Sequence, residues 1–554
     1  MNFQTYSESA ALKLLTVCYA GGLLISSTCW AQTNIPVLPE TLVTATMAPT
    51  SPKKIGSAIT VITADEIEQR GATYVPELLR DVPGLAVNKS GPVGGLSQIR
   101  IRGTEANQTL FLIDGIEAND PNTSEPLWDD VFPGDIERIE VLRGSQSSVH
   151  GSDAIGGVIH IITKRGRGAP KVTATTEAGS FDTVSARSGV SGGTDDYHYA
   201  FNVSGYTTRG VSASRPSSAN PQPNEADGYE NITASAKLGA TLINNLNLQV
   251  TGRFTRARVE LDSQDIGFDC CHDMLDAQTK ETKRIQFVGG TTGTYRLFDG
   301  AWEHGIKAQW SEVHSKSFEF GQATFKSVGR KIKLGYHNTF RFGIKALANS
   351  RHTITTGLET ENEKAVGFNF KESRDQDGFF GEYQLELFDR FTLTGSGRHD
   401  RNDVFKDADT WRTTAAYRIE EWGTKIRTSY GTGVKNPTFT ELFGFNAPFT
   451  PNPNLQPESN EGYDFGVDQS FWQNRVHLGG TFFINRVKDA ITGSGTSSQN
   501  SVGTTKIWGS EWTVDADITN NFSVNASYTL SLIHISEPTR PRLSSYAVFC
   551  LKKK

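Results

Sequence analysis

Two acidic segments of the sequence carry side chains that suit a hard metal cation. Glu225 and Asp227 stand two positions apart. The second segment is a run of aspartates: Asp262, Asp265, Asp269, Asp273 and Asp276. Clustered carboxylate oxygens are the ligands that Ca²⁺ prefers in proteins. Glu225, Asp227, Asp262 and Asp265 are therefore candidate calcium ligands, and the sequence indicates no other cofactor.

A pair of adjacent cysteines lies inside the second acidic segment. Cys270 and Cys271 are followed directly by His272. Zinc ligands supplied by one segment stand two or more positions apart, so this spacing does not fit a zinc site. A local disulfide and an ordinary loop both stay open for the pair.

Catalytic patterns are missing from the sequence. It has no Gly-x-Ser-x-Gly motif, no phosphate-binding loop and no paired metal-ligand histidines. The formal net charge is −6, which excludes the basic footprint of a nucleic-acid-binding protein. The sequence therefore argues against an enzyme and against a nucleic-acid partner.

Residues 1–31 have the pattern of a secretory signal peptide. Lys13 precedes an apolar stretch over 14–25, and Cys29-Trp30-Ala31 ends in a small residue, so Gln32 is the expected mature start. Twelve apolar residues are too few for a transmembrane helix, which needs about 20. No later window is apolar enough either, so a membrane form of this chain requires a closed β-barrel.

Residues 32–57 and 58–165 differ in composition and in hydrophobic pattern. The first range is rich in Thr, Pro and Ala and reads as a flexible tether, within which 40–46 is prone to form a strand. The second reads as a compact α+β domain. We expect helices over 64–70 and 74–81, and strands over 57–62, 98–102, 109–113, 136–142 and 158–163. Thr63 and Glu66 have capping-box spacing at the first helix.

From residue 166 to 531 the pattern becomes one of alternating strands. In 246–255, apolar Leu246, Val250 and Phe254 alternate with polar residues such as Arg253, and 512–530 alternates similarly. Strands of this kind, joined by short turns at one end and long polar loops at the other, are typical of membrane barrels. The long connections over 207–228, 259–281 and 443–460 are the expected extracellular loops. The predicted fold is an all-β transmembrane barrel with an N-terminal α+β plug.

Several motifs in order resemble those of TonB-dependent outer-membrane receptors. They are Thr41-Leu42-Val43-Thr44-Ala45 in the tether, the plug segments 78–84, 99–103, 112–115, 136–144 and 151–163, and the barrel segments 452–458 and 482–486. The resemblance covers residues 41–531. It implies a family of 22-stranded barrels in the outer membrane of a Gram-negative bacterium, with a plug in the lumen.

The resemblance also implies roles for particular residues. Thr41, Leu42, Val43, Thr44 and Ala45 would couple to the TonB energy-transducing complex. Arg100, Arg102 and Arg143 would be costly to bury unpaired, so we expect them to meet carboxylates of the barrel wall and lock the plug. Apical plug loops would bind substrate, through Gly91, Gly94, Gly95, Asn119, Asp120 and Trp128. Trp128 either stacks on a flat substrate or anchors its loop.

The plug stretch 98–163 is most similar to the cobalamin receptor branch. Cobalamin is therefore the expected substrate, and a ferric siderophore is the alternative. Cobalamin receptors order their outer loops with calcium, which is the role that the resemblance implies for the calcium ligands above. A haem substrate is disfavoured because residues 435–443 contain no His. A passive porin or an outer-membrane enzyme is a remote alternative, since neither has the tether and plug motifs.

The C-terminal end departs from the barrel pattern. Alternation stops after Leu530, and residues 532–554 contain Pro538 and Pro541 and end in three lysines. This tail resembles a translated sequencing adapter joined to a truncated gene. About 360 barrel residues at ~20 per strand and connection give roughly 17–18 strands, so we expect an incomplete barrel.

Overall fold

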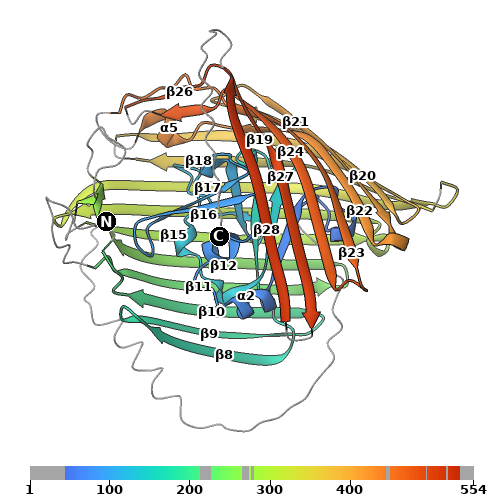
Figure 1. Ribbon diagram of the computed structural model, residues 1–554, viewed down its shortest axis with the longest axis horizontal. Helices are drawn as coiled ribbons and strands as arrows, with labels where there is room; N and C mark the ends of the chain where they lie inside the picture. Colours follow the sequence, from blue (N-terminus) through green and yellow to red (C-terminus); the bar gives the residue numbers. More distant parts are fainter. Residues whose placement is uncertain are drawn as a thin grey trace, which may run out of the picture. The chain divides into compact units, whose positions relative to one another are not determined.

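The fold combines a small mixed domain with one large antiparallel sheet (Figure 1). The computed structural model describes residues 44–212, 226–264, 274–275, 280–347, 349–367, 369–444, 449–493, 496–519 and 522–536. The expected signal peptide, the first part of the expected tether and residues 537–554 lie outside these ranges, so the predictions made for them rest on sequence alone. None of the described helices is long and apolar enough to cross a membrane.

The N-terminal domain, called the plug here, contains a five-stranded sheet in the order β1-β6-β7-β4-β5 and a separate hairpin β2-β3. Its strands are β1 Ile59–Thr63, β2 Leu85–Ser90, β3 Leu96–Ile101, β4 Thr109–Ile113, β5 Ile116–Glu117, β6 Ile136–Arg143 and β7 Gly157–Thr163. Its helices are α2 Ala64–Arg70, α3 Val75–Leu79 and α4 Ser147–His150, with short 3-10 turns η1 Pro52–Lys54, η2 Ala106–Gln108, η3 Trp128–Asp130 and η4 Pro133–Asp135. Every predicted element of this domain has a counterpart here, whereas β2, β5 and α4 were not predicted.

The predicted capping box at α2 is present. The backbone N–H of Thr63 donates to Glu66 Oε2 at 2.7 Å, and the backbone N–H of Glu66 donates to Thr63 Oγ1 at 3.3 Å. Gly71 ends the helix with φ 57°, in the left-handed region that glycine adopts without strain. Ile67 on its inner face joins a core with Leu78, Leu79 and residues of β3, β4, β6 and β7. Local capping therefore places the helix that covers the plug sheet.

The large sheet contains 17 strands in a closed order, from β10 through β28 and back to β8 and β9. They are β8 Gly168–Gly179, β9 Thr183–Gly193, β10 Tyr197–Thr208, β11 Tyr229–Ile243, β12 Leu246–Glu260, β15 Glu281–Leu297, β16 Trp302–Glu319, β17 Gln322–Ile344, β18 Ser350–Val366, β19 Lys371–Leu387, β20 Phe391–Asn402, β21 Ala408–Ile419, β22 Thr424–Lys435, β23 Glu458–Phe471, β24 Val476–Lys488, β27 Thr504–Thr519 and β28 Phe522–Ser536. This number agrees with the strand count expected from sequence length.

Consecutive strands of the barrel pair antiparallel, so their connections alternate between two ends. One end carries short turns, including η5 Phe298–Gly300 and η6 Glu420–Trp422. The other end carries long connections that hold the pair β13 Ser263–Gln264 and β14 Met274–Leu275, helix α5 Phe439–Phe443, and the pair β25 Ile491–Gly493 and β26 Ser498–Asn500. In membrane barrels short turns are periplasmic and long loops extracellular, so the long-loop end is the outer end.

Side chains alternate between the two faces of the barrel strands as the sequence predicted. In β12, Val250 and Phe254 are exposed on the outer face, whereas Arg253 and Thr255 are buried toward the plug. The exposed outer faces carry many large apolar residues, which suits contact with lipid. The last strand continues to Ser536, in register with Thr504, and so reaches beyond the expected end of alternation at Leu530.

Candidate functional site

The described part of the tether packs against the plug. Thr44 and Ala45 belong to the predicted TonB-coupling segment, and both are buried, with Thr44 at 0 % exposure. Lys54 Nζ contacts Glu386 Oε2 of β19 at 2.7 Å, and the backbone N–H of Met47 donates to Glu382 Oε1 of the same strand at 3.0 Å. Residues 44–57 thus differ from the expected free tether, because plug and barrel groups hold them. Thr41, Leu42 and Val43 lie outside the described residues.

Thr44 sits at the centre of a buried polar network. Its Oγ1 donates to Glu140 Oε2 at 2.6 Å and lies 2.9 Å from His160 Nδ1, and its carbonyl oxygen lies 2.9 Å from His150 Nε2. The backbone N–H of Gly115 donates to His160 Nε2 at 2.8 Å. Nε2 therefore accepts, which places the single imidazole proton of His160 on Nδ1, facing Thr44.

Both histidines of this network resist protonation. Burial lowers the pKa of His160 to about 3 and that of His150 to about 4. The geometry agrees, because a proton on Nε2 of His160 would face the Gly115 N–H. The network is therefore neutral at the imidazoles near pH 7 and holds the tether through directional hydrogen bonds.

Arg102 of the plug pairs with two carboxylates of the barrel wall. Its side chain is fully buried, with Nε 2.6 Å from Glu511 Oε1 of β27 and Nη1 paired with Asp464 of β23. Arg143 donates to the carbonyl oxygen of Pro83 at 2.7 Å, and its Nε lies 3.7 Å from Glu511 Oε2. Burial opposes charge on Arg102, but the two carboxylates outweigh it and hold its pKa above the ordinary value. Burial lowers the pKa of Arg143 to about 10.

Arg100 does not take part in this lock. It pairs with Glu105 of the plug at 3.4 Å, and its side chain is 36 % exposed. Arg100 and Arg102 lie two positions apart, as residues on one face of a strand do. Arg102, however, follows the end of β3 and has φ 55°, so its side chain does not follow the direction of the Arg100 side chain. The expectation that Arg100 meets a barrel carboxylate was wrong.

Four carboxylates of the plug meet cations on the opposite wall, a set that sequence reasoning missed. The pairs are Asp114 with Lys237 of β11 at 2.6 Å, Asp135 with Arg253 of β12 at 2.5 Å, Asp130 with Arg284 of β15 at 2.7 Å, and Glu117 with Lys331 of β17. Asp114, Asp130 and Asp135 each end or follow a short element. That position in the sequence could have indicated that they contact the barrel. Among the described residues, plug anions face β11–β17 and cations of the plug and tether face β19–β27.

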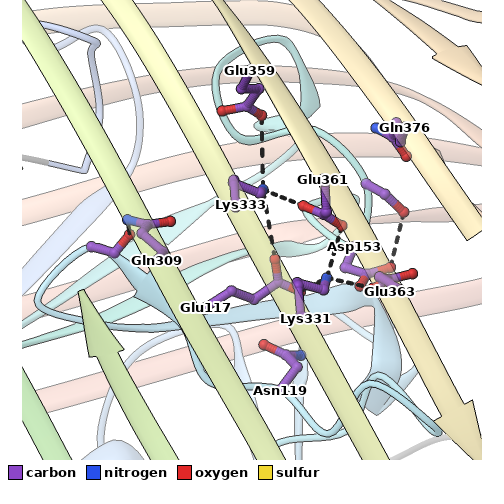
Figure 2. Close-up of polar contacts among 12 residues, drawn as sticks. Glu117, Asn119, Asp153, Gln309, Lys331, Lys333, Glu359, Glu361, Glu363 and Gln376 are labelled. Atoms are coloured by element: carbon purple, nitrogen blue, oxygen red, sulfur yellow. Dashed lines mark hydrogen bonds and ion pairs between the residues drawn. The ribbon is translucent and has the colours of Figure 1, made fainter. Parts of the chain in front are cut away.

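Glu117 belongs to a larger charged cluster on the barrel wall (Figure 2). Lys331 Nζ also contacts Glu363 at 2.7 Å and Glu361 at 3.2 Å, and Lys333 Nζ contacts Glu361 at 2.6 Å. Burial raises the pKa of Glu117 to about 7, although Lys331 opposes the shift. A small hollow with room for about one water molecule adjoins the cluster, lined by β5, β16 and β17. Both lysines therefore keep barrel partners when Glu117 is removed.

Trp128 does not face the outer end as a substrate platform. Its side chain is 1 % exposed, its ring lies 4.4 Å from that of Phe111, and it belongs to the plug core. Tyr229 of the barrel lies over the neighbouring carboxylates, with its hydroxyl donating to Asp130 at 2.8 Å. Of the two roles considered for Trp128, anchoring fits, since a buried indole cannot stack on a ligand.

Asn119 and Asp120, also predicted to bind substrate, form hydrogen bonds within their own loop. Asn119 is 2 % exposed and braces its loop by donating to the carbonyl oxygens of Thr109 and Ser124. Asp120 accepts from the backbone N–H of Asn122 at 2.9 Å. Three glycines, Gly91, Gly94 and Gly95, form the turn between β2 and β3, and only Gly91 is exposed. The exposed tip of this turn is completed by Leu96 at 51 %.

The predicted calcium ligands are only partly described. Asp227 and Asp262 are buried at the outer end, and Glu225 and Asp265 lie outside the described residues. Within the described ranges, no three His, Cys, Asp or Glu residues gather closely enough to hold a metal. Cys270 and Cys271 also fall outside them.

Comparison with known proteins identifies the family of the chain. Residues 173–546 match the family described as "TonB dependent receptor-like, beta-barrel", and residues 51–158 match the "TonB-dependent Receptor Plug Domain". The barrel match alone covers more than half of the chain. Receptors of this family are transporters of the outer membrane of Gram-negative bacteria rather than enzymes.

Several solved structures share the fold. The siderophore receptor PirA from Acinetobacter baumannii is 17 % identical, with a TM-score of 0.69 over 88 % of this chain and 81 % of that one. PirA from Pseudomonas aeruginosa is 20 % identical, with a TM-score of 0.66 over 87 % and 88 %. The ferric enterobactin receptor PfeA from Pseudomonas aeruginosa, a mutant in complex with enterobactin, is 18 % identical, with a TM-score of 0.68 over 87 % and 81 %. A plug locked into a barrel by buried ion pairs, together with these matches, shows that the chain belongs to the TonB-dependent receptor family.

Proposed function

We propose that this protein imports a bulky, scarce metal chelate across the outer membrane, with energy supplied through its tether by a TonB complex. The observation that carries the proposal is the plug, which is held by buried charges on both sides of the lumen. Breaking one buried pair by removing a partner costs about 3–5 kcal/mol. Thermal opening of the whole set is therefore rare, and passage of a large solute requires work applied from outside the barrel.

The substrate that we propose first is a ferric siderophore. Siderophore receptors are prominent among the solved structures with this fold, and the ferric enterobactin receptor is one of them. These likenesses are below 25 % identity, so they support the choice of substrate class less than the choice of fold. Cobalamin is the second candidate, favoured by the similarity of plug residues 98–163 to the cobalamin branch.

Calorimetry with the purified protein in detergent separates the two candidates. We expect ferric enterobactin or another ferric siderophore to bind tightly and saturably, and cyanocobalamin to bind weakly. The opposite result would move the assignment to cobalamin. Repeating the titration with EDTA and with added Ca²⁺ tests Glu225, Asp227, Asp262 and Asp265, because a calcium site at the outer loops must change the affinity.

Energy coupling is tested in the tether. A strand added to a partner's sheet needs its backbone N–H groups, and proline removes one of them. We expect Val43→Pro to abolish uptake of the bound chelate. Its affinity for the chelate should stay within about twofold of the parent, which is well below the tenfold change that corresponds to 1.4 kcal/mol. Thr33→Pro, in the same tether but outside Thr41–Ala45, is the control that should retain uptake. Uptake by Val43→Pro at the parental rate would rule out coupling through this segment.

A further inference from the structure

The inner face of strands β11, β12, β15, β16 and β17 carries more cations than carboxylates. Directly paired positions share a face of the sheet, and Arg284 of β15 shows which face is inward, because it reaches the plug at Asp130. Among the described positions from Arg284 to the short-turn end, the one inward carboxylate of these strands is Glu303, which pairs with Arg296 and Arg341. The remaining inward cations, called the cation ladder here, are Arg284, Arg253, Lys331, Lys237, Lys333 and Lys307.

Strand pairing gives the order of the cation ladder along the barrel wall. From the long-loop end to the short-turn end come Arg284, then one row with Arg253 and Lys331, then one row with Lys237 and Lys333, then Lys307. Successive levels stand two or four residues apart, so at ~3.4 Å per residue the ladder covers roughly 27 Å of strand. The ladder therefore accompanies a solute along most of its way through the barrel.

The cation ladder has two kinds of counter-ion. Within the described residues, Arg284, Arg253 and Lys237 each form one ion pair, and each carboxylate belongs to the plug. The other three members keep carboxylates of β18, as Figure 2 shows for Lys331 and Lys333. Movement of the plug away from this wall therefore leaves three cations of β11, β12 and β15 without an ion-pair partner from the described barrel.

These three cations require an anion when the plug moves. A charge whose buried partner is removed is left uncompensated, and carboxylate or phenolate oxygens restore charge-assisted hydrogen bonds to Lys and Arg. The opposite wall differs, because its inward side chains have both signs: Glu382 of β19 and Arg412 of β21 both contact the tether. A passage along β11–β17 is thus selective for anions, whereas a passage along the other wall is not.

We propose that Arg284, Arg253 and Lys237 line the path of the imported chelate past the displaced plug and bind its anionic groups in succession. The plug carboxylates occupy the same cations while the receptor is closed. The imported chelate is therefore an anion, such as a ferric tris-catecholate, and not a neutral compound. This inference rests on the proposed import function and adds to it the charge of the substrate and the wall along which it moves.

Exchanging the two charges of one pair separates a path from a lock. A lock needs an ion pair of either sense, whereas a path needs the cation on the wall. Asp135→Arg/Arg253→Asp keeps a pair between plug and barrel and gives the wall a carboxylate. We expect uptake of ferric enterobactin, an anionic tris-catecholate, to slow roughly tenfold or more in cells that carry the full-length variant, because a charge-assisted hydrogen bond is lost along the path.

The binding affinity of the same variant distinguishes the path from the outer binding site. The Arg253 side chain is only 5 % exposed, so a chelate bound above the docked plug does not reach it. The affinity of the purified variant for ferric enterobactin should therefore stay within about twofold of the parent, a change well below the tenfold step that corresponds to 1.4 kcal/mol. Uptake at the parental rate by the exchanged pair would overturn the inference and leave the import function standing.

Matched variants control for folding and for charge exchange as such. Arg167→Glu/Glu137→Arg exchanges a pair between plug and barrel that lies outside the ladder, with Nη2 and Oε1 3.4 Å apart, and should retain parental uptake. Asp114→Asn/Lys237→Gln removes a second ladder cation without leaving a buried charge, and should also slow uptake. Heat-modifiable mobility on gels shows that each barrel is folded, and the neutral pair keeps the test decisive if the exchanged pair does not fold.

The charge of the substrate is tested with the parent chain. Uptake of ferric enterobactin is compared with uptake of ferrichrome, a neutral ferric tris-hydroxamate, and of cyanocobalamin. We expect uptake of the anionic chelate alone. Uptake of a neutral compound would overturn the inference while supporting import, and uptake of none of the three would overturn the proposed function together with it.

Discussion

Arg102 carries a charge into a site with no solvent, and its two carboxylate partners come from strands far along the chain. Glu511 lies 409 positions away in the sequence, and Asp464 lies 362 positions away. A buried ion pair contributes little by itself compared with an apolar replacement of both partners, but removing one partner leaves a buried charge uncompensated. Loss of Arg102 should therefore destabilise the interface between plug and barrel.

Replacement of Arg102 tests this reasoning. We expect Arg102→Met to destabilise the docked plug by about 3–5 kcal/mol, because Asp464 and Glu511 lose their partner. Hydrogen exchange of the β3 amides should accelerate by about two to three and a half orders of magnitude, at 1.4 kcal/mol for each factor of ten. Arg100→Met is the matched control and should change exchange by less than tenfold. Equal effects of the two substitutions would contradict the assignment of the lock to Arg102.

The two buried histidines predict a pH dependence of the tether. In the folded protein the pKa of His160 is about 3 and that of His150 is about 4, below the ordinary value of 6.5. The unfolded form therefore binds more protons as the pH falls below 6.5, so stability is full above that pH and declines toward pH 4. At pH 5 the loss is about 2 kcal/mol for each histidine. The protection factors of the amides of residues 44–50, which correct each exchange rate for the intrinsic rate at that pH, should be lower at pH 5 than at pH 7.

A variant separates these histidines from other titrating groups. In His150→Gln/His160→Gln the difference in protection factor between pH 7 and pH 5 should largely disappear, because neither glutamine titrates. Persistence of the full difference would assign the pH dependence to another group.

At the scale of elements, the two walls of the barrel differ in how they respond to loss of the plug. Lys331 and Lys333 keep Glu359, Glu361 and Glu363 as partners when Glu117 leaves. Asp464 and Glu511 on the other wall lose both Arg102 and Arg143 when the plug leaves. Separation at β17 is therefore less costly than separation at β23 and β27, and the hollow beside β5 lies on the less costly side.

Cross-links between plug and barrel test this difference. A Cβ at Gly329 of β17 would lie 3.1 Å from Pro121 Cβ, and one at Gly433 of β22 would lie 3.1 Å from Ser145 Oγ. Both pairs are near disulfide distance. In a background without Cys270, Cys271 and Cys550, we expect oxidised Pro121→Cys/Gly329→Cys to block uptake until a reductant is added. Oxidised Ser145→Cys/Gly433→Cys should still transport, and the reverse pattern would place the opening on the other wall.

Local elements could be predicted from the sequence, and contacts between distant elements could not. The capping box of Thr63 and Glu66 lies within four residues, so helix α2 was predicted with its bounds. The strand β2 was missed because Leu85–Ser90 is short and carries the charged Lys89 on the same face as Leu85 and Val87, so its sequence alternates less clearly than its burial does. Trp128 was placed at a ligand surface because its loop position was visible and its burial against Phe111 was not. The carboxylate partners of Arg102 carry no local pattern that distinguishes them from other strand residues.

At the scale of the whole molecule, the plug accounts for the difference between a gated receptor and an open pore. Deletion of residues 44–163 should leave Lys237, Arg253, Asp464 and Glu511 lining a water-filled lumen, where exposed charges are readily solvated. We expect this deletion variant to conduct ions in planar bilayers, while the full chain conducts at background level. Conductance by the full chain equal to that of the deletion variant would show that the plug does not seal the barrel.

The opposite signs of charge on the two walls also set the rotational register of the plug. Plug anions meet cations of β11–β17, and cations of the plug and tether meet carboxylates of β19–β27. These ion pairs therefore have opposite senses on the two sides of the barrel axis, and half a turn would separate the charges from their partners. A plug domain supplied as a separate chain should consequently reassemble with the empty barrel in one orientation only. Ion pairs that fix the orientation in this way would direct the plug to a single position inside the barrel during assembly.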